Sequence, residues 1–249
     1  MKILVSLSNV PDTTTKIRLT ADKKNMDMEG VQWVINPWDE LALSRAIELK
    51  EKYPAVIEKI TVIHVGGIHT EPTIRKALAM GADDAIRVDT EAKDAYYVAG
   101  QLAEVIKNNP YEIILCGIES SDYNGCSVGG MLAEFLGFAS VSSVSFLDIE
   151  NENVTLNREI DGGYEKIYAK FPFVAIVQKG IAIEPKIPTM RGIMTARSKP
   201  LQVIHAAQID FLTEEISYDL PASKTVCKMV AAENAGDLID LLRSEAKVI

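Results

Sequence analysis

The sequence has few cysteines and no long hydrophobic run. It has three cysteines, Cys116, Cys126 and Cys227, none of which lies in a C-x-x-C pair. Because the number is odd, at least one cysteine has no disulfide partner within the chain. That usage is typical of a reduced, intracellular protein rather than of a disulfide framework. No stretch approaches the roughly 18 apolar residues of a membrane-spanning helix, so we expect no membrane span. A first strand beginning at Lys2 leaves no room for a signal or transit peptide, and we expect a cytoplasmic protein.

Positive charge is also scarce. Lysine and arginine together number 26 against 35 aspartates and glutamates, which gives a formal net charge of −9. This balance argues against a general nucleic-acid binder, whose affinity depends on neutralising phosphates with cationic side chains. A small anionic ligand is still compatible with the charge, because backbone N–H groups can hold a phosphate.

The motifs of several enzyme classes are absent. The three histidines, His64, His69 and His205, are too scattered for metal-ligand spacing. The sequence contains neither the G-x-S-x-G elbow of hydrolases nor the G-x-x-x-x-G-K-[ST] loop of NTPases. No G-x-G-x-x-G follows the first strand, which weighs against a dinucleotide dehydrogenase. We therefore expect no substrate chemistry carried out by this chain itself.

The first two-thirds of the chain alternate short apolar segments with segments of helical periodicity. Such alternation is typical of an α/β protein with a doubly wound, mostly parallel sheet. A strand order of 3-2-1-4-5 would suit these segments, but the pattern does not fix the order. Strands are predicted at residues 2–8, 59–65, 84–88, 112–117 and 142–149, and helices at residues 38–52, 71–80, 92–107 and 125–136.

The last third of the chain has a different character. A turn signal at Asp161-Gly162-Gly163 predicts a β-hairpin. Residues 184–219 show no convincing period, and residues 234–247 predict a helix with a leucine face that needs a partner. We expect an α/β domain over residues 1–183 and, over residues 184–249, a segment that includes an arm packed on something other than its own core.

Four small or polar segments follow predicted strands and suggest a ligand site. They are residues 6–9, 36–37, 65–67 and 117–129, the last of which reads GIESSDYNGCSVG. In an open parallel sheet, ligands bind beyond the carboxyl ends of the strands where the strand order reverses. A glycine-rich loop that opens onto a helix lets backbone amides face a phosphate.

Two residue groups in these segments have two interpretations each. Asn124-Gly125 and Ser127 either form a turn and a helix cap or add side-chain hydrogen bonds to a phosphate. Asn36, which precedes Pro37, either caps the following helix or presents its amide to an adenine edge. The sequence alone leaves both choices open.

Three stretches match a known family. They are residues 74–83 (IRKALAMGAD), residues 158–163 (REIDGG) followed by Glu165 and Pro172, and residues 184–194 (EPKIPTMRGIM). Through them the chain resembles the β subunit of electron transfer flavoproteins over nearly its whole length. The resemblance implies a heterodimer in which the α subunit holds a redox-active FAD and the β subunit holds a structural AMP.

The resemblance also implies which residues contact the AMP. They gather at the ends of three predicted strands and at the start of two helices. The implied AMP contacts are Ser6, Asn36, Pro37, Trp38, Asp39, Val65, Gly117, Ile118, Glu119, Ser120, Ser121, Asp122, Tyr123, Asn124, Gly125, Cys126, Ser127, Val128 and Gly129.

A protruding loop that docks partner dehydrogenases is implied as well. Met190 stands in it where the family usually has an anchoring leucine, and methionine is similar in volume and apolar. Glu159 is implied at the subunit interface near the FAD. The loop residues are Lys186, Ile187, Pro188, Thr189, Met190, Arg191, Gly192, Ile193, Met194 and Thr195. Acyl-CoA or amine-type dehydrogenases would supply electrons, and a quinone oxidoreductase would accept them.

The AMP loop departs from the family pattern at Cys126-Ser127-Val128-Gly129, where the family usually has Asn-Gln-Thr-Gly or Gln-Val-Gly. Backbone contacts to a phosphate do not depend on that glutamine. Two alternatives stay open: an electron-bifurcating β subunit that binds a second FAD and takes electrons from NADH, and a stand-alone adenine-nucleotide-binding protein.

Overall fold

The computed structural model describes residues 1–150, 153–223 and 227–249. These residues form two compact units, one of Met1–Ile17 with Met28–Glu215 and one of Arg18–Asp27 with Ile216–Ile249. The division differs from the boundary expected at residue 183, because residues 184–215 belong to the larger unit.

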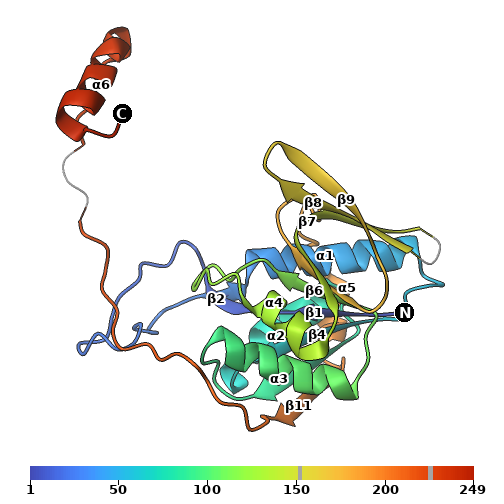
Figure 1. Cartoon of the computed structure of the whole chain (residues 1–249). Helices are drawn as coiled ribbons and strands as arrows, with labels where there is room; N and C mark the ends of the chain where they lie inside the picture. Colours follow the sequence, from blue (N-terminus) through green and yellow to red (C-terminus); the bar gives the residue numbers. More distant parts are fainter. Residues whose placement is uncertain (151–152, 224–226) are drawn as a thin grey trace. The chain divides into compact units, whose positions relative to one another are not determined.

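Among the described residues, nine strands form the sheet of the larger unit, in the order β11-β5-β4-β1-β6-β10-β7-β8-β9 (Figure 1). Only the β7–β8 and β8–β9 pairs are antiparallel. This confirms the predicted doubly wound, mostly parallel sheet. The strands are β1 (Lys2–Ser6), β4 (Lys59–Val65), β5 (Asp84–Asp89), β6 (Ile113–Gly117), β7 (Ala139–Glu150), β8 (Asn153–Ile160), β9 (Gly163–Ala169), β10 (Phe173–Val177) and β11 (Leu201–His205).

For the first four predicted strands, which are β1, β4, β5 and β6, the observed order agrees with the expected 3-2-1-4. The order differs at the fifth predicted strand, β7. β10 (Phe173–Val177) lies between β6 and β7, so β7 is not the direct neighbour of β6. β10 is fully buried and wholly apolar, FVAIV, which suits a position inside the sheet. The predicted hairpin forms with β8 and β9, and Gly162 adopts a φ of 85° in its turn.

Helices cover both faces of the sheet (Figure 1). Successive residues of β1 point to opposite faces: Ile3 packs in the core beside α1 and α2, and Leu4 in the core beside α3 and α4. The helices of this unit are α1 (Pro37–Lys52), the 3₁₀ turn η1 (Ile68–Thr70), α2 (Glu71–Met80), α3 (Ala95–Asn108), α4 (Val128–Leu136) and α5 (Met190–Ala196).

Two predicted helices begin three residues later than expected. α3 starts after Asp94, whose side chain accepts a hydrogen bond from the amide of Tyr97 at 2.8 Å and thereby caps the helix. α4 starts after Ser127. A small two-stranded sheet, β2 (Asn9–Pro11) with β3 (Trp33–Ile35), lies between β1 and α1 in the chain.

Regular structure occurs where the sequence showed no period. Within residues 184–219 lie α5 (Met190–Ala196) and β11 (Leu201–His205), and β11 pairs in parallel with β5 at the sheet edge. Beyond it, the side-chain amide of Gln101 on α3 bonds both backbone groups of Ala207. The first part of the expected arm therefore packs on this chain's own sheet and helices.

The smaller unit has little regular structure. A bridge joins Leu19 to Met26, and the Tyr218 amide donates to the Lys23 carbonyl at 2.8 Å. The predicted terminal helix is present as α6 (Ala235–Leu241), preceded by the 3₁₀ turn η2 (Ala232–Asn234) and continued by the π-helical turn η3 (Leu242–Ala246). None of the described residues in this unit is buried.

Within the described ranges, no helix combines the length and the apolar character that crossing a bilayer requires.

Candidate functional site

The strand order reverses beside β1, and the predicted strand ends meet there. β1 pairs in parallel with β4 on one side and with β6 on the other, with Ser6 opposite Ile63 and Val5 opposite Leu115. Ser6, Val65 and Gly117 are the last residues of these three strands and so lie at the same edge of the sheet. This edge is the position where doubly wound sheets bind ligands.

Asn36 ties the start of α1 to the loop that follows β6. Its side chain is buried; Nδ2 donates to the Glu119 carbonyl at 2.8 Å, and Oδ1 accepts from the Ser121 amide at 3.2 Å. Asn36 occupies the N-cap position of α1 but makes no side-chain cap bond. Asn36 therefore begins the helix without a side-chain cap bond, and its side-chain amide holds the loop at the crevice.

Asp39, in the first turn of α1, joins the ends of β1 and β6. Its Oδ2 accepts from the Ser8 amide at 2.8 Å, and its Oδ1 accepts from the Gly117 amide at 2.9 Å. Gly117 has to be glycine here, because a Cβ atom would overlap the Asp39 carboxylate and the Trp38 side chain. One buried carboxylate thus satisfies two backbone amides at the reversal point.

The environment of Asp39 favours its protonated form. Burial raises the pKa of Asp39 to about 7, from an ordinary value of 3.8. Hydrogen bonds from the amides of Ser8 and Gly117 oppose this rise but do not cancel it. The crevice therefore carries a group that titrates near neutral pH.

The loop after β6 is held in a tight, irregular conformation. The Asn124 amide donates to the Ser120 carbonyl at 2.8 Å, and Asn124 and Cys126 have φ values of 53° and 49°. Asn124 therefore forms a turn, as one of the two interpretations predicted. Ser127 occupies the N-cap position of α4, but its hydroxyl donates to the Gly125 carbonyl at 2.5 Å and makes no side-chain cap bond.

The N-terminus of α4 presents free amides at the same edge. The first intrahelical bond runs from the Met131 amide to the Ser127 carbonyl at 3.0 Å. The amides of Val128, Gly129 and Gly130 precede it and have no partner within the helix. Three N–H groups without an intrahelical partner, at the positive end of a helix dipole, suit an anion such as a phosphate.

Gly129 allows this helix end to approach the sheet. A Cβ atom there would lie 2.7 Å from Cγ1 of Ile176 on β10, which is closer than two carbon atoms can pack. The sequence signal for the site was glycine and small polar residues at strand ends, and the structure brings these segments together. Sequence reasoning missed the clamp that Asn36 and Asp39 form.

The predicted docking loop lies away from this edge and forms α5 (Met190–Ala196). Thr189 caps it, because its hydroxyl accepts from the Gly192 amide at 3.0 Å. Met190 is 77% exposed, and Ile187 and Met194 are exposed with it. Exposed apolar side chains gathered on a short helix and on the segment just before it are typical of a protein-interaction site.

α5 is mounted firmly on the larger unit. A Cβ atom at Gly192 would overlap the Ala79 carbonyl of α2, so the two helices approach closely. Arg75 of α2 donates to the carbonyls of Ala196 and Lys199, at 2.9 and 2.7 Å. The apolar tip is therefore carried on a rigid support.

Glu159 lies on β8, in the β8–β9 hairpin. Its side chain is exposed and accepts a hydrogen bond from the Gln178 side chain. Its register partner on β9 is Tyr164, which is also exposed.

Comparison with known proteins identifies the family. The family model for the electron transfer flavoprotein domain matches residues 25–209. The electron transfer flavoprotein subunit beta of Bacillus subtilis strain 168 is 34% identical over the full length of both chains. The chain belongs to the electron transfer flavoprotein β-subunit family. The pig (Sus scrofa) subunit beta is 31% identical, with 100% of this chain and 99% of the relative covered. The subunit beta of Syntrophomonas wolfei is 36% identical, with 90% of this chain and 87% of the relative covered.

Family membership makes this chain an electron transfer subunit. The resemblance seen in the three sequence stretches is thereby confirmed, and flavin involvement and an α-subunit partner follow from the family.

Proposed function

We propose that this chain binds AMP at the crevice, completes the FAD site of an α subunit, and docks dehydrogenases through α5. The observation that carries the nucleotide assignment is the set of free amides at Val128, Gly129 and Gly130. Gly129 among them lies beside Cys116 near the end of β6 and beside Ile176 near the end of β10. AMP supplies the phosphate for those amides, and its adenosine part lies along the strand ends.

Charge distribution supports an amide-based phosphate site. The chain carries a net charge of −9 and none of the crevice residues expected from sequence is lysine or arginine. The Asp39 carboxylate already occupies the amides of Ser8 and Gly117. The phosphate therefore takes the α4 end of the crevice, where amides are free, rather than the β1–β6 junction.

The α subunit would contact two parts of this chain, the smaller unit and the β8–β9 hairpin. The smaller unit has no buried residue in its described part, so its apolar side chains are available to a partner. The β8–β9 hairpin presents Glu159, which we assign to the interface near the FAD. The electrons pass through that FAD, and this chain makes no bond to the substrate of the dehydrogenase.

Extraction of bound nucleotides tests the proposal. The full chain, purified with its α subunit, is denatured in acid and the released nucleotides are separated by chromatography. We expect AMP and FAD in equal amounts. FAD at twice the expected amount without AMP would favour the bifurcating alternative, and the absence of any purine would contradict the proposal.

A matched pair of variants locates the nucleotide on this chain. Gly129→Val should drive α4 away from Ile176 and reduce AMP content while FAD is retained, whereas Gly236→Val on α6, where a Cβ atom meets nothing within 4 Å, should leave AMP unchanged. Equal AMP content in both variants would place the nucleotide elsewhere.

A further inference from the structure

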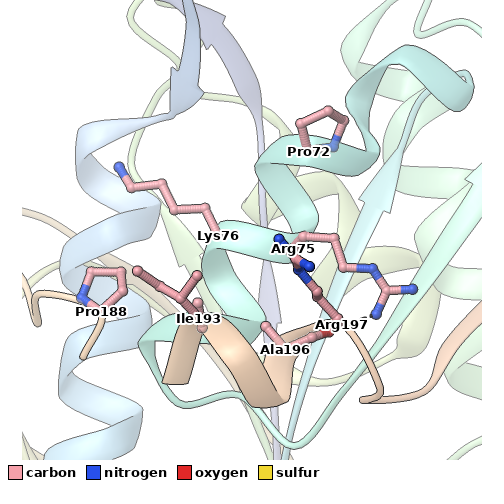
Figure 2. A pocket seen from close by; sticks show the side chains of 8 residues that line it. Pro72, Arg75, Lys76, Pro188, Ile193, Ala196 and Arg197 are labelled. Atoms are coloured by element: carbon pink, nitrogen blue, oxygen red, sulfur yellow. Dashed lines mark hydrogen bonds between the residues drawn. The ribbon is translucent and has the colours of Figure 1, made fainter. Parts of the chain in front are cut away.

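A cationic hollow lies between α2 and α5, beside the docking helix. It has a volume of about 450 Å³. Its walls combine the apolar side chains of Pro72, Pro188 and Ile193 with the positive side chains of Arg75, Lys76 and Arg197 (Figure 2). Arg75 and Lys76 come from α2, and Arg197 follows directly after α5.

The three cations of the hollow are poorly neutralised. Among the described residues, Arg75 donates to two main-chain carbonyls, those of Ala196 and Lys199, and has no carboxylate partner. Lys76 pairs with Glu40 at 2.9 Å. Arg197 is exposed and makes no ion pair with any residue in the described part of the chain. The hollow thus holds three positive charges and one carboxylate.

Several cations elsewhere in the larger unit have a carboxylate partner. Arg45 pairs with Glu48 at 2.8 Å, Lys50 with Asp83 at 2.7 Å, and the buried Arg87 with Asp89. Carboxylates outnumber cations in the chain, 35 to 26, so a local excess of positive charge is not a consequence of composition. Two arginines without a carboxylate at one hollow leave room for a negative group from outside.

The docking helix continues directly into this hollow. Ile193 lies both on α5 and in the wall of the hollow, while Met190 and Met194 on the same helix are exposed. Residues 184–199 include four cations, Lys186, Arg191, Arg197 and Lys199, against a single acid, Glu184. An apolar tip with a positive flank matches a partner surface that has an apolar pocket beside an acidic side chain.

We propose that the hollow between α2 and α5 receives an aspartate or glutamate side chain of the dehydrogenase that docks on Met190. This inference rests on the proposed docking function and adds a second, charged contact to it. The guanidinium of Arg197 binds the carboxylate, and Arg75 contributes positive potential from a position fixed by its two carbonyl acceptors.

The test measures reduction of the assembled heterodimer by an acyl-CoA dehydrogenase at low and high salt. Arg197 is changed rather than Arg75, because Arg75 also holds α5 in place. Arg197→Glu should lower the second-order rate about tenfold at low ionic strength, and the loss should nearly disappear above about 0.5 M salt. Arg197→Lys keeps the positive charge that accelerates association, so its rate should stay within about twofold of that of the unchanged protein.

A control separates this contact from the net charge of the protein. Lys170 is exposed on the connection from β9 to β10 and forms no ion pair within the described residues, so Lys170→Glu makes the same kind of charge change elsewhere. We expect Lys170→Glu to leave the rate within about twofold.

The outcomes distinguish the two proposals. Equal losses in Arg197→Glu and Lys170→Glu, or a loss that persists unchanged at high salt, would overturn the carboxylate contact while docking itself stands. A second result would also overturn the carboxylate contact: inorganic phosphate binds the unchanged protein but not Arg197→Glu, while neither phosphate nor the substitution changes the rate. The hollow would then be a site for a free anion. If the unchanged heterodimer accepts no electrons from the dehydrogenase, the proposed docking function fails as well.

Discussion

The two compact units bury their apolar residues to opposite extents. In the larger unit, the side chain of Phe173 on β10 is 0% exposed and the sheet is covered on both faces. In the smaller unit Met229 is 86% exposed, and Ile216, Leu220 and Leu238 are exposed as well. The larger unit therefore contains its own core, whereas the smaller unit presents its apolar side chains to solvent or to a partner.

This difference indicates where stability and assembly reside. Folding free energy comes mainly from apolar burial, so it is concentrated in the larger unit. The smaller unit gains little by folding alone and would gain more if, as proposed, a partner subunit covered it. Changes in the two units should accordingly affect different measurements.

The largest effect is expected from the core of the larger unit. Phe173→Ala removes a fully buried ring, and the cavity should lower the free energy of unfolding by about 3–5 kcal/mol. Urea unfolding followed by circular dichroism measures the loss. Met229→Ala in the smaller unit should change the same quantity by less than about 0.5 kcal/mol, and a loss equal to that of Phe173→Ala would remove the distinction between the units.

The next effect concerns assembly. Leu238→Asp places a charge on α6 where we expect the α subunit to cover an apolar face, and it should weaken the heterodimer by about 2–3 kcal/mol. Sedimentation of the α–β mixture measures the affinity. Ser244→Asp, on the exposed turn η3, provides the matched change, and similar affinities for both variants would contradict the role of α6.

Asp39→Asn should destabilise the larger unit by about 1–3 kcal/mol, because an asparagine side chain has one acceptor oxygen for two backbone amides. The effect also has a pH signature. The folded chain keeps a proton on Asp39 up to about pH 7, whereas an exposed aspartate loses it near 3.8.

Folding therefore favours the protonated form, and the stability contributed by Asp39 falls as pH rises from about 4 to about 7, then stays constant. Denaturation at a series of pH values should show this decline in the unchanged protein and a flatter profile in Asp39→Asn. Parallel profiles for the two proteins would contradict the assignment.

The smallest effect is expected at the docking helix. Met190→Ala should lower electron transfer from a dehydrogenase about tenfold, because one exposed apolar anchor carries much of such a contact. FAD content should not change, since α5 lies apart from the crevice. Ile183→Ala, an exposed position outside α5, serves as control. Loss of FAD in Met190→Ala would show that α5 is misassigned.

Much of the fold could be predicted because period and composition are local signals. The central strands are short apolar runs and the helices carry an apolar stripe, so both are visible in the sequence. α5 and β11 were not predicted. α5 has seven residues and is held by its Thr189 cap and by its packing on α2, while β11 is an edge strand that depends on β5.

The candidate site could be predicted only in outline. Glycine and small polar residues at strand ends indicate a ligand crevice, since parallel strand ends share one edge. The clamp was not predictable, because Asn36 bonds to Glu119, which is 83 residues away in the sequence. The hollow beside α5 was not predictable for the same reason, because Arg75 and Arg197 are far apart in the sequence and come together only through tertiary packing.

Hydrogen–deuterium exchange of the assembled protein, with and without AMP, tests the central claim most directly. If the free amides of α4 hold the phosphate, AMP should slow exchange at residues 118–130 and at the start of α1, and should leave α5 unchanged. Exchange that slows at α5 or α6 but not at Val128, Gly129 and Gly130 would contradict the account.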